Sequence, residues 1–164
     1  MFQSGDKIVY GSSGVCEVLE VCVPPFAGKH ERDRLYYKLQ PVGGTEVIYT
    51  PVDTTVFMRP VMTRQEAERL ILRLPEIREE VCSSHSITLL RQQYDTLFRS
   101  HQCEDYVRLA KGIYLKEHSG KKLGQTDQRY MKRAEDMLNG ELAAALDIRP
   151  EEVPGYIKKV LESE

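Results

Sequence analysis

Residues 2–18 read FQSGDKIVYGSSGVCEV, and this stretch decides the fold together with YYKL at 36–39 and VIYTPVD at 47–53. Short β-prone runs alternate here with turn residues, as in the GSSG cluster at 11–14. The dipeptide Gly43-Gly44 separates two of the runs, and it is typical of a tight hairpin turn because both residues tolerate positive φ. Five short strands within about sixty residues predict a small N-terminal β-barrel, a fold that usually recognises a partner.

Helical periodicity replaces the strand pattern after Arg59-Pro60. Residues 63–66 read TRQE, a capping box, and the apolar spacing behind it predicts a linking helix over about 64–81 that Pro75 ends or kinks. Residues 82–86 are expected to form a loop. Further helices are expected at about 86–100, at about 103–118, at about 126–146 with Thr126 as N-cap, and from Pro150 onward. The sequence thus predicts an α+β protein with a β domain at 1–60 and an all-α helical domain at 61–164, whose bundle spans about 86–162.

The composition is that of an ordinary globular protein, with 164 residues of which 41% are hydrophobic and 29% charged. The four cysteines (Cys16, Cys22, Cys82 and Cys103) are too few and scattered for a disulfide scaffold, and Cys16 and Cys22 share one strand parity. No apolar run reaches membrane-spanning length, and the N-terminus lacks an export signal. We therefore expect reduced thiols, a cytoplasmic location and no membrane partner.

Motifs for catalysis or metal binding are absent from the sequence. Cys82-x-x-His85 and His101-x-Cys103 are the best candidates for metal ligands, but their spacing is unlike that of structural zinc sites. No glycine-rich phosphate loop, G-x-S-x-G or H-E-x-x-H motif occurs. We expect no metal, no cofactor, no small-molecule substrate and no enzymatic activity.

Positive charge is concentrated in one segment of a chain whose net charge is −2. Residues 108–133 carry eight Lys or Arg against two Asp or Glu, a net charge of +6, whereas residues 134–164 carry three against eight, a net charge of −5. Such a basic segment can lie against a phosphate backbone and bind it without reading sequence. The alternative is a solvated helix face.

A set of residues along most of the chain resembles one known family. In the N-terminal part they are Phe2, Gly5-Asp6, Val9-Tyr10, Gly14-Val15, Gly28, Tyr36-Tyr37, Leu39 and Pro51-Val52-Asp53. In the helical part they are Ile113-Tyr114, Leu123, Asp127, Arg129, Ala134-Glu135, Leu138 and Glu141-Leu142-Ala143. Their order and spacing resemble the CarD-like bacterial transcription regulators, whose N-terminal domain is shared with the transcription-repair coupling factor. The resemblance implies a Tudor/SH3-like barrel followed by a helical domain.

The resemblance also implies a protein partner, the lobe of the RNA polymerase β subunit, on which the barrel docks partly by strand pairing. An exposed sheet edge is a template for such pairing. The implied polymerase-binding residues are Glu46, Val47, Ile48, Tyr49, Thr50 and Pro51. Tyr49 stands at a contact position where some relatives carry arginine.

For the helical domain the resemblance implies contact with double-stranded promoter DNA at the upstream edge of the transcription bubble. Lys116 and Arg133 correspond best to basic contacts of the family, and neighbours by charge are Lys121, Lys122, Arg129 and Lys132. Many relatives use a Trp as a wedge at the start of this domain. This chain has no Trp and no aromatic residue at 82–87, so we expect it to stabilise open promoter complexes less than its Trp-bearing relatives do. Two functions remain open: a polymerase-docked, DNA-contacting transcription regulator, and a protein-binding adaptor without DNA binding.

Overall fold

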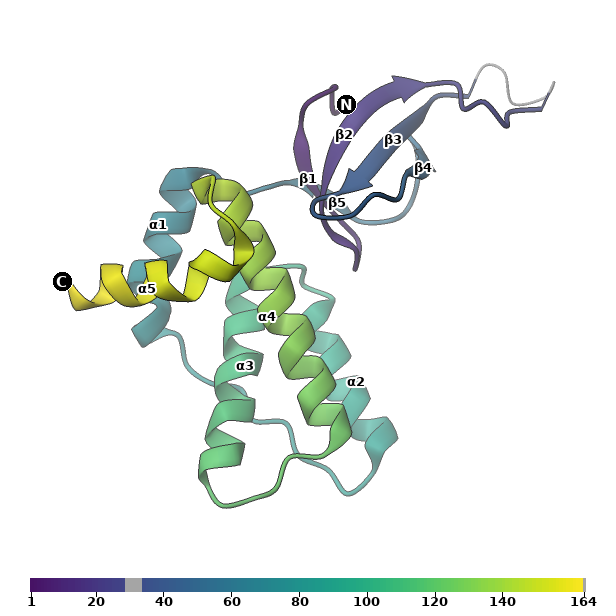
Figure 1. Ribbon diagram of the computed structural model, residues 1–164. Coiled ribbons are helices and arrows are strands. Elements are labelled where there is room, and N and C mark those ends of the chain that lie inside the picture. The colour runs from purple at the N-terminus through teal and green to yellow at the C-terminus, as the bar shows by residue number, and fades with distance from the viewer. Residues whose placement is uncertain (29–33, 164) are drawn as a thin grey trace. The chain divides into compact units, whose positions relative to one another are not determined.

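The computed structural model describes residues 1–28 and 34–163, which form two compact units. The first, Met1–Met62, is called the β unit below, and the second, Thr63–Glu164, is called the helical unit. Strands are confined to the first and helices to the second (Figure 1). The chain is therefore an α+β protein, as the sequence predicts.

Five strands make up the sheet of the β unit: β1 (Lys7–Tyr10), β2 (Gly14–Cys22), β3 (Tyr36–Pro41), β4 (Ile48–Pro51) and β5 (Met58–Pro60). All neighbours are antiparallel, and the order is β4-β3-β2-β1-β5. Within the described residues β4 and β5 are not paired with each other, so the sheet stays open and has two edges. Of the predicted Tudor/SH3-like barrel, the structure confirms a five-stranded antiparallel sheet but not closure.

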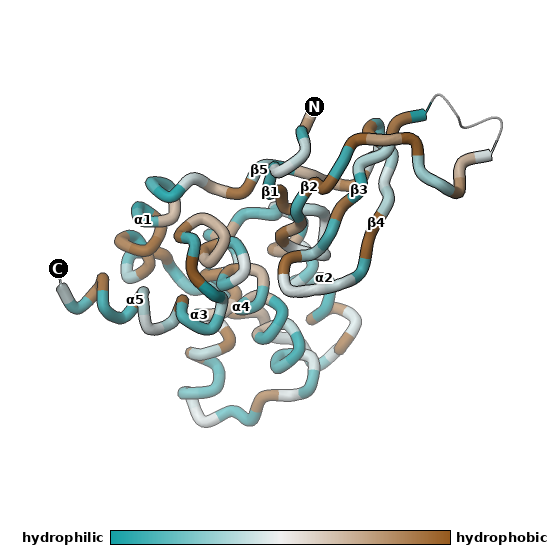
Figure 2. The backbone as a smooth tube through the Cα atoms, turned by 45° about the horizontal axis from the view of Figure 1, so that its top comes forward, coloured by the Kyte–Doolittle hydropathy of each residue, from teal (hydrophilic) through white to brown (hydrophobic). Residues whose placement is uncertain are grey.

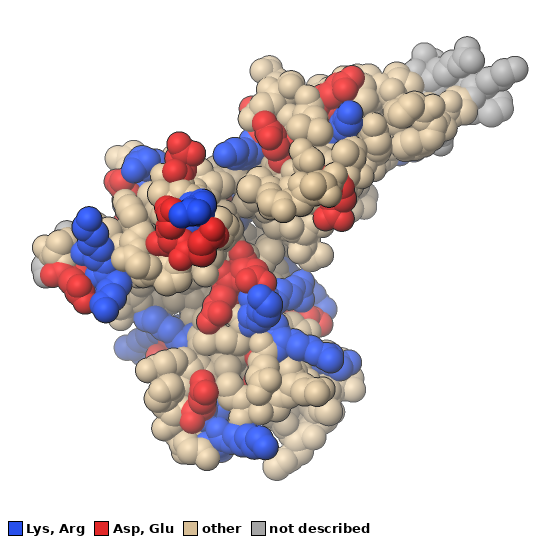
Figure 3. Space-filling model, in the orientation of Figure 1, with Lys and Arg blue, Asp and Glu red and all other residues tan. Residues whose placement is uncertain are grey.

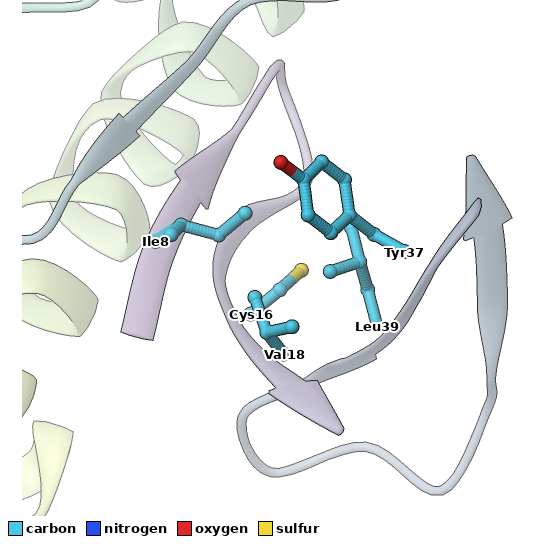
Figure 4. Close-up of a cluster of buried hydrophobic side chains, with 5 residues drawn as sticks. All are labelled: Ile8, Cys16, Val18, Tyr37 and Leu39. Carbon is cyan, nitrogen blue, oxygen red and sulfur yellow. The ribbon is translucent and has the colours of Figure 1, made fainter. Parts of the chain in front are cut away.

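The core of the β unit follows strand alternation until β2 reaches a bulge. Ile8, Cys16, Val18, Tyr37 and Leu39 point into one cluster, each at most 3% exposed (Figure 4). The register of β2 against β3 shifts between Val18 and Glu20, which reverses the parity of the rest of β2. Val21 therefore packs on the core, and Cys22 pairs with Tyr36 on the opposite face. The expectation that Cys16 and Cys22 share a face is wrong because of this bulge.

The connection between β3 and β4 contains the predicted turn at Gly43-Gly44 but is longer than a tight hairpin turn. Strand β3 ends at Pro41 and β4 begins only at Ile48. A turn closes where the Gly44 N–H donates to the Pro41 carbonyl at 3.0 Å, with Gly43 at φ +85°. Gly43 thus adopts the positive φ expected of it, but Thr45, Glu46 and Val47 extend the connection beyond a tight turn.

The helical unit contains α1 (Arg64–Arg73), α2 (Ile87–Phe98), α3 (Cys103–His118), α4 (Gln125–Leu146) and α5 (Val153–Glu162), with 3₁₀ turns η1 (Leu74–Glu76) and η2 (Pro150–Glu152). The capping box of Thr63 and Glu66 is confirmed. Helix α1 ends at Arg73, short of the predicted 81, and Pro75 lies in η1. Residue Pro150 opens a 3₁₀ turn rather than α5 itself.

Helices α2, α3 and α4 pack together, and α1 and α5 contact one another and α4. Hydrophobic and hydrophilic residues alternate along the helices, as their amphipathic spacing requires (Figure 2). The buried face of the unit includes Leu90, Tyr94, Phe98, Tyr106, Leu109, Ile113, Ala134, Leu142 and Leu146. None of the described helices is both long and apolar enough to span a membrane.

Candidate functional site

Strand β4 is an edge strand, and its backbone N–H and C=O groups point alternately toward β3 and toward the open edge. The Val52 N–H donates to the Leu35 carbonyl at 3.1 Å, and Thr50 and Ile48 stand opposite Tyr37 and Leu39. Opposed residues in an antiparallel pair alternate between bonded and non-bonded positions. Ile48, Thr50 and Val52 therefore direct N–H and C=O toward β3. Tyr49 and Pro51 direct theirs toward the open edge, where Pro51 supplies only a carbonyl.

The side chains of the predicted polymerase-binding residues alternate in the same way. Ile48 packs against the core, and Thr50 is 3% exposed, so neither side chain is available to a partner. Tyr49 and Pro51 lie on the opposite face with Lys38 and Tyr36, which stand across from them on β3. Glu46 and Val47 are exposed in the connection before β4. The stretch thus offers its outward side chains and its edge backbone, but not every residue named from the sequence.

An aromatic residue outside the predicted site adjoins Tyr49. The Phe26 ring lies edge-on to the Tyr49 ring at 5.3 Å between centroids and edge-on to Tyr36 at 6.2 Å. Phe26 stays 62% exposed, while Tyr36 is only 8% exposed. Sequence reasoning missed Phe26 because it follows Pro24-Pro25 outside any strand pattern. An isolated Phe in such a segment was the available signal.

Three of the eight cations in the basic segment 108–133, namely Arg108, Lys111 and Lys116, bond carboxylates or carbonyls within the helical unit. Arg108 bonds Glu80 at 3.0 Å and Asp105 at 3.2 Å. The Lys111 ammonium donates to the carbonyls of Leu74 and, at 2.7 Å, of Ile77. These contacts attach the chain around η1 to α3, so the charges of Arg108 and Lys111 serve the fold.

Lys116 is the most deeply engaged cation among the predicted DNA contacts. Its ammonium lies 3.1 Å from Asp127 Oδ1 and 3.2 Å from the Cys82 carbonyl, and its side chain is only 12% exposed. Asp127 also accepts a hydrogen bond from the Tyr94 hydroxyl at 2.6 Å and from the Gly124 N–H at 3.3 Å. Burial, and then the bond to Asp127, raise the pKa of Tyr94 well above its ordinary value. We assign Lys116 to this structural network.

The same network explains where α4 begins. Gly124 is its N-cap, and the Asp127 carboxylate accepts the Gly124 N–H. The predicted N-cap, Thr126, is wrong, because Asp127 supplies the side-chain oxygen one turn inside the helix and Thr126 lies within the helix.

The remaining predicted DNA contacts lie along α4 and the loop before it. The Arg133 guanidinium stands over the Phe98 ring at 4.1 Å and near Tyr130. Lys132 makes an exposed ion pair with Asp136 at 3.2 Å, a kind of contact worth little. Lys121, Lys122 and Arg129 are exposed and have no ion pair within the part of the chain that the structure describes. Over the helical unit, basic and acidic side chains are interspersed on the face shown in Figure 3.

The start of the helical bundle carries apolar surface near these cations. Val81 and Leu115, both about half exposed, line a shallow pocket of about 190 Å³ together with Ser83, Lys116, Ser119 and Lys121. Ile87 and Leu89, at the first turn of α2, are 60% and 52% exposed. Ser83, Ser84 and His85, within the 82–87 stretch that lacks the Trp, are polar, so exposed apolar side chains flank them at Val81 and at Ile87 and Leu89.

The cysteine and histidine residues considered as metal ligands lie in separate surroundings. Cys103 is buried, with its thiol 3.2 Å from Glu141 Oε1, while His101 adopts φ +53° in the turn before α3. Burial and the nearby Glu80 raise the pKa of the Cys82 thiol. Among the described residues, no group of three or more His, Cys, Asp or Glu side chains is arranged to hold a metal ion.

An open sheet edge such as that of β4 can accept a strand from a partner protein. Residues 2–62 match the family model of the CarD-like/TRCF RID domain, which spans the β unit. Residues 2–62 are therefore similar to the CarD-like/TRCF RID domain, as the sequence resemblance suggested. The RID domain interacts with RNA polymerase, so RNA polymerase is the partner class of this chain. No curated protein matches the chain.

Proposed function

We propose that this chain is a cytoplasmic bacterial transcription regulator that docks on the β subunit of RNA polymerase through β4 and contacts promoter DNA through its helical unit. The observation that carries the proposal is the match to an RNA polymerase-interacting domain in a unit with an open β4 edge. A partner strand added to an open edge gains main-chain hydrogen bonds. The Tyr49 N–H and C=O supply the centre of that pairing.

The DNA-binding part of the proposal rests on three exposed cations. Lys121 and Lys122 lie in the loop before α4, and Arg129 lies one turn inside that helix. Each can neutralise a phosphate without breaking an ion pair of the described structure. Three contacts support only weak binding on their own, but tethering to polymerase raises the local concentration of promoter DNA. Lys116 is left out of the proposed contact set because its ammonium is engaged with Asp127.

Substitutions at Tyr49 test the docking mode, with binding of the full chain to RNA polymerase measured by calorimetry. Tyr49→Ala removes the ring and keeps the edge N–H, whereas Tyr49→Pro removes both. Because the N–H does not serve the β3–β4 ladder, proline is tolerated at such an edge position. If β4 pairs with a polymerase strand, Tyr49→Pro binds more weakly than Tyr49→Ala by about 1 kcal/mol or more. Equal affinity of the two variants, with equal melting temperatures, would remove strand pairing from the proposal.

The second candidate function is an adaptor that binds polymerase without DNA. It is favoured by the observation that Arg108, Lys111 and Lys116 are engaged internally, which leaves much of the +6 segment unavailable. A titration of the full chain with duplex DNA at two salt concentrations separates the candidates. A salt-dependent affinity supports the regulator, and no binding at low salt supports the adaptor.

A further inference from the structure

Phe26 remains mostly exposed to solvent in the folded β unit. It is 62% exposed, although burying a Phe side chain stabilises a fold by about 1.5–3 kcal/mol. Its ring nonetheless makes edge-on contacts to Tyr36 and Tyr49, with interplanar angles of 82° and 87°. Edge-to-face contacts of this kind are favourable and orient the ring. The fold thus places an aromatic surface on the outward face of the sheet without burying it.

This aromatic surface lies on the strands that end at the open edge. Tyr36 is on β3 and Tyr49 is on β4, and Phe26 contacts both rings. The position that a partner strand would occupy is next to Tyr49, the residue whose N–H and C=O point outward. Side chains of neighbouring strands lie close enough for diagonal contacts between long or aromatic groups. Phe26 is therefore within the range of a side chain on an added strand.

Among the described residues, two pairs of opposite charges lie near the aromatic surface. Arg34 stands over the Tyr36 ring at 5.7 Å and pairs with Asp53 at 3.4 Å. Glu20 and Lys38 are cross-strand partners on the outward face. Val47, which is 44% exposed, adds apolar area beside Tyr49. An apolar centre with a balanced polar rim is the anatomy of a protein-binding surface.

We propose that Phe26 is the anchor of the docking surface, and that it receives an apolar side chain from an extended segment of RNA polymerase paired with β4 about Tyr49. The inference rests on the proposed function and adds the recognition chemistry. Pro51 lacks an N–H, so at that position the partner strand can donate to the Pro51 carbonyl but finds no donor, which restricts the register. Rigid aromatic residues contribute strongly to interfaces because little side-chain entropy is lost on binding. Binding through this surface is insensitive to salt, since screening acts on charges.

The experiment compares Phe26→Ala with Phe57→Ala in the full chain, using core RNA polymerase from the same organism and calorimetry. Phe57 is 38% exposed and directly precedes β5, at the opposite edge of the sheet. Phe57→Ala is therefore a control that removes one aromatic ring away from β4. We expect Phe26→Ala to weaken binding by about tenfold or more, the effect of a hot-spot residue, and Phe57→Ala to bind as wild type does. Raising the salt concentration should leave the wild-type affinity nearly unchanged.

A third variant, Phe26→Leu, controls for a folding defect because it keeps an apolar side chain at the site. It should lose less affinity for polymerase than Phe26→Ala does, at an unchanged melting temperature. If wild type binds polymerase while Phe26→Ala and Phe57→Ala bind equally well, the anchor assignment is overturned and the proposed function survives. A steep loss of wild-type affinity with salt overturns the apolar recognition. If wild type does not bind polymerase, both the proposed function and the anchor fail.

Discussion

The β4 edge and the basic segment 108–133 were both identified from the sequence as binding surfaces, but the fold uses them in opposite ways. At β4 the groups that a partner needs are left open: the Tyr49 backbone points outward and Phe26 is exposed. In the basic segment, Arg108, Lys111 and Lys116 bond groups inside the helical unit, although their charges stand out in the sequence. A concentration of charge is thus weaker support for a binding site than an unpaired edge, because internal carboxylates and carbonyls compete for the charge.

The largest effect that would sharpen this contrast is expected at Asp127. Asp127→Ala leaves the buried Lys116 ammonium without its carboxylate and removes the acceptor of Tyr94 and of the Gly124 N–H. Breaking a buried pair by removing one partner costs about 3–5 kcal/mol. Urea unfolding followed by circular dichroism should show a loss of this size, and the exposed Lys122→Met should change the unfolding free energy by less than about 0.5 kcal/mol. Equal stability of the two variants would mean that Lys116 is not structural and is free to bind DNA.

The second comparison concerns Gly112, where the segment after η1 crosses α3. A Cβ on Gly112 would overlap the backbone carbonyl of Glu80, which is held near α3 because the Glu80 N–H donates to the Arg108 carbonyl at 3.0 Å. Gly112→Ala should therefore destabilise the helical unit by about 1–3 kcal/mol, although alanine is the better helix former. The matched control is Gly140→Ala in α4, where no side chain or other segment of the described structure lies within 4 Å of the added Cβ. A more stable Gly112→Ala protein would show that this segment does not pack on α3.

For the cations that remain exposed, the effect is expected in binding rather than stability. Reversing Lys121 and Lys122 to Glu should lower affinity for duplex DNA similarly on all sequences and reduce the slope of log affinity against log salt by about one per lost phosphate contact. The corresponding change at Lys158 and Lys159 of α5 is a control with the same change in net charge. If both double variants bind DNA as wild type does, the segment is a solvated face and the adaptor function is favoured.

The smallest effect is a change in the modification rate of one thiol in the β unit. Cys22 stands opposite Tyr36 on the outward face. Burial and Glu20 raise its pKa, so alkylation is slow at neutral pH and speeds up as pH rises through that pKa. Docked polymerase should slow iodoacetamide modification of Cys22, read by mass spectrometry. Cys16 is fully buried with a pKa raised to about 11, chiefly by burial, and should stay unmodified with or without polymerase. An unchanged Cys22 rate in a saturated complex would place the interface elsewhere.

The raised pKa of Cys16 also predicts the direction in which the free energy of unfolding changes with pH. Its folded pKa lies above the ordinary 9.0, so the folded state favours the protonated thiol. The contribution of this thiol to stability is therefore complete below pH 9 and is lost as pH rises toward 11. Chemical unfolding of wild type and Cys16→Ala across this range checks the sign: the wild-type stability should fall more steeply.

Elements whose signal is local were predictable from sequence. Helix α3 and the capping box at Thr63 lie where the pattern predicts them, because helical spacing and capping act over a few residues. The errors arose where distant segments intervene. The bulge in β2 is set by pairing with β3, and the N-cap of α4 is set by Asp127, which is also bound to Lys116 and Tyr94.

The sequence by itself determined the α+β class, most helix positions and the RID domain, because these depend on local periodicity and on the order of residues along the chain. Only the tertiary structure decided which groups are left for partners. Whether Lys116 is free depends on Asp127 reaching it across the α3–α4 loop, and whether Tyr49 offers its backbone depends on its pairing with β3. The exposure of Phe26 likewise depends on tertiary contacts, because its ring contacts Tyr36 and Tyr49 and the residue stays 62% exposed. A polar or apolar group is available to a partner only where the fold leaves it without an internal contact. The spacing of residues along the chain does not encode this.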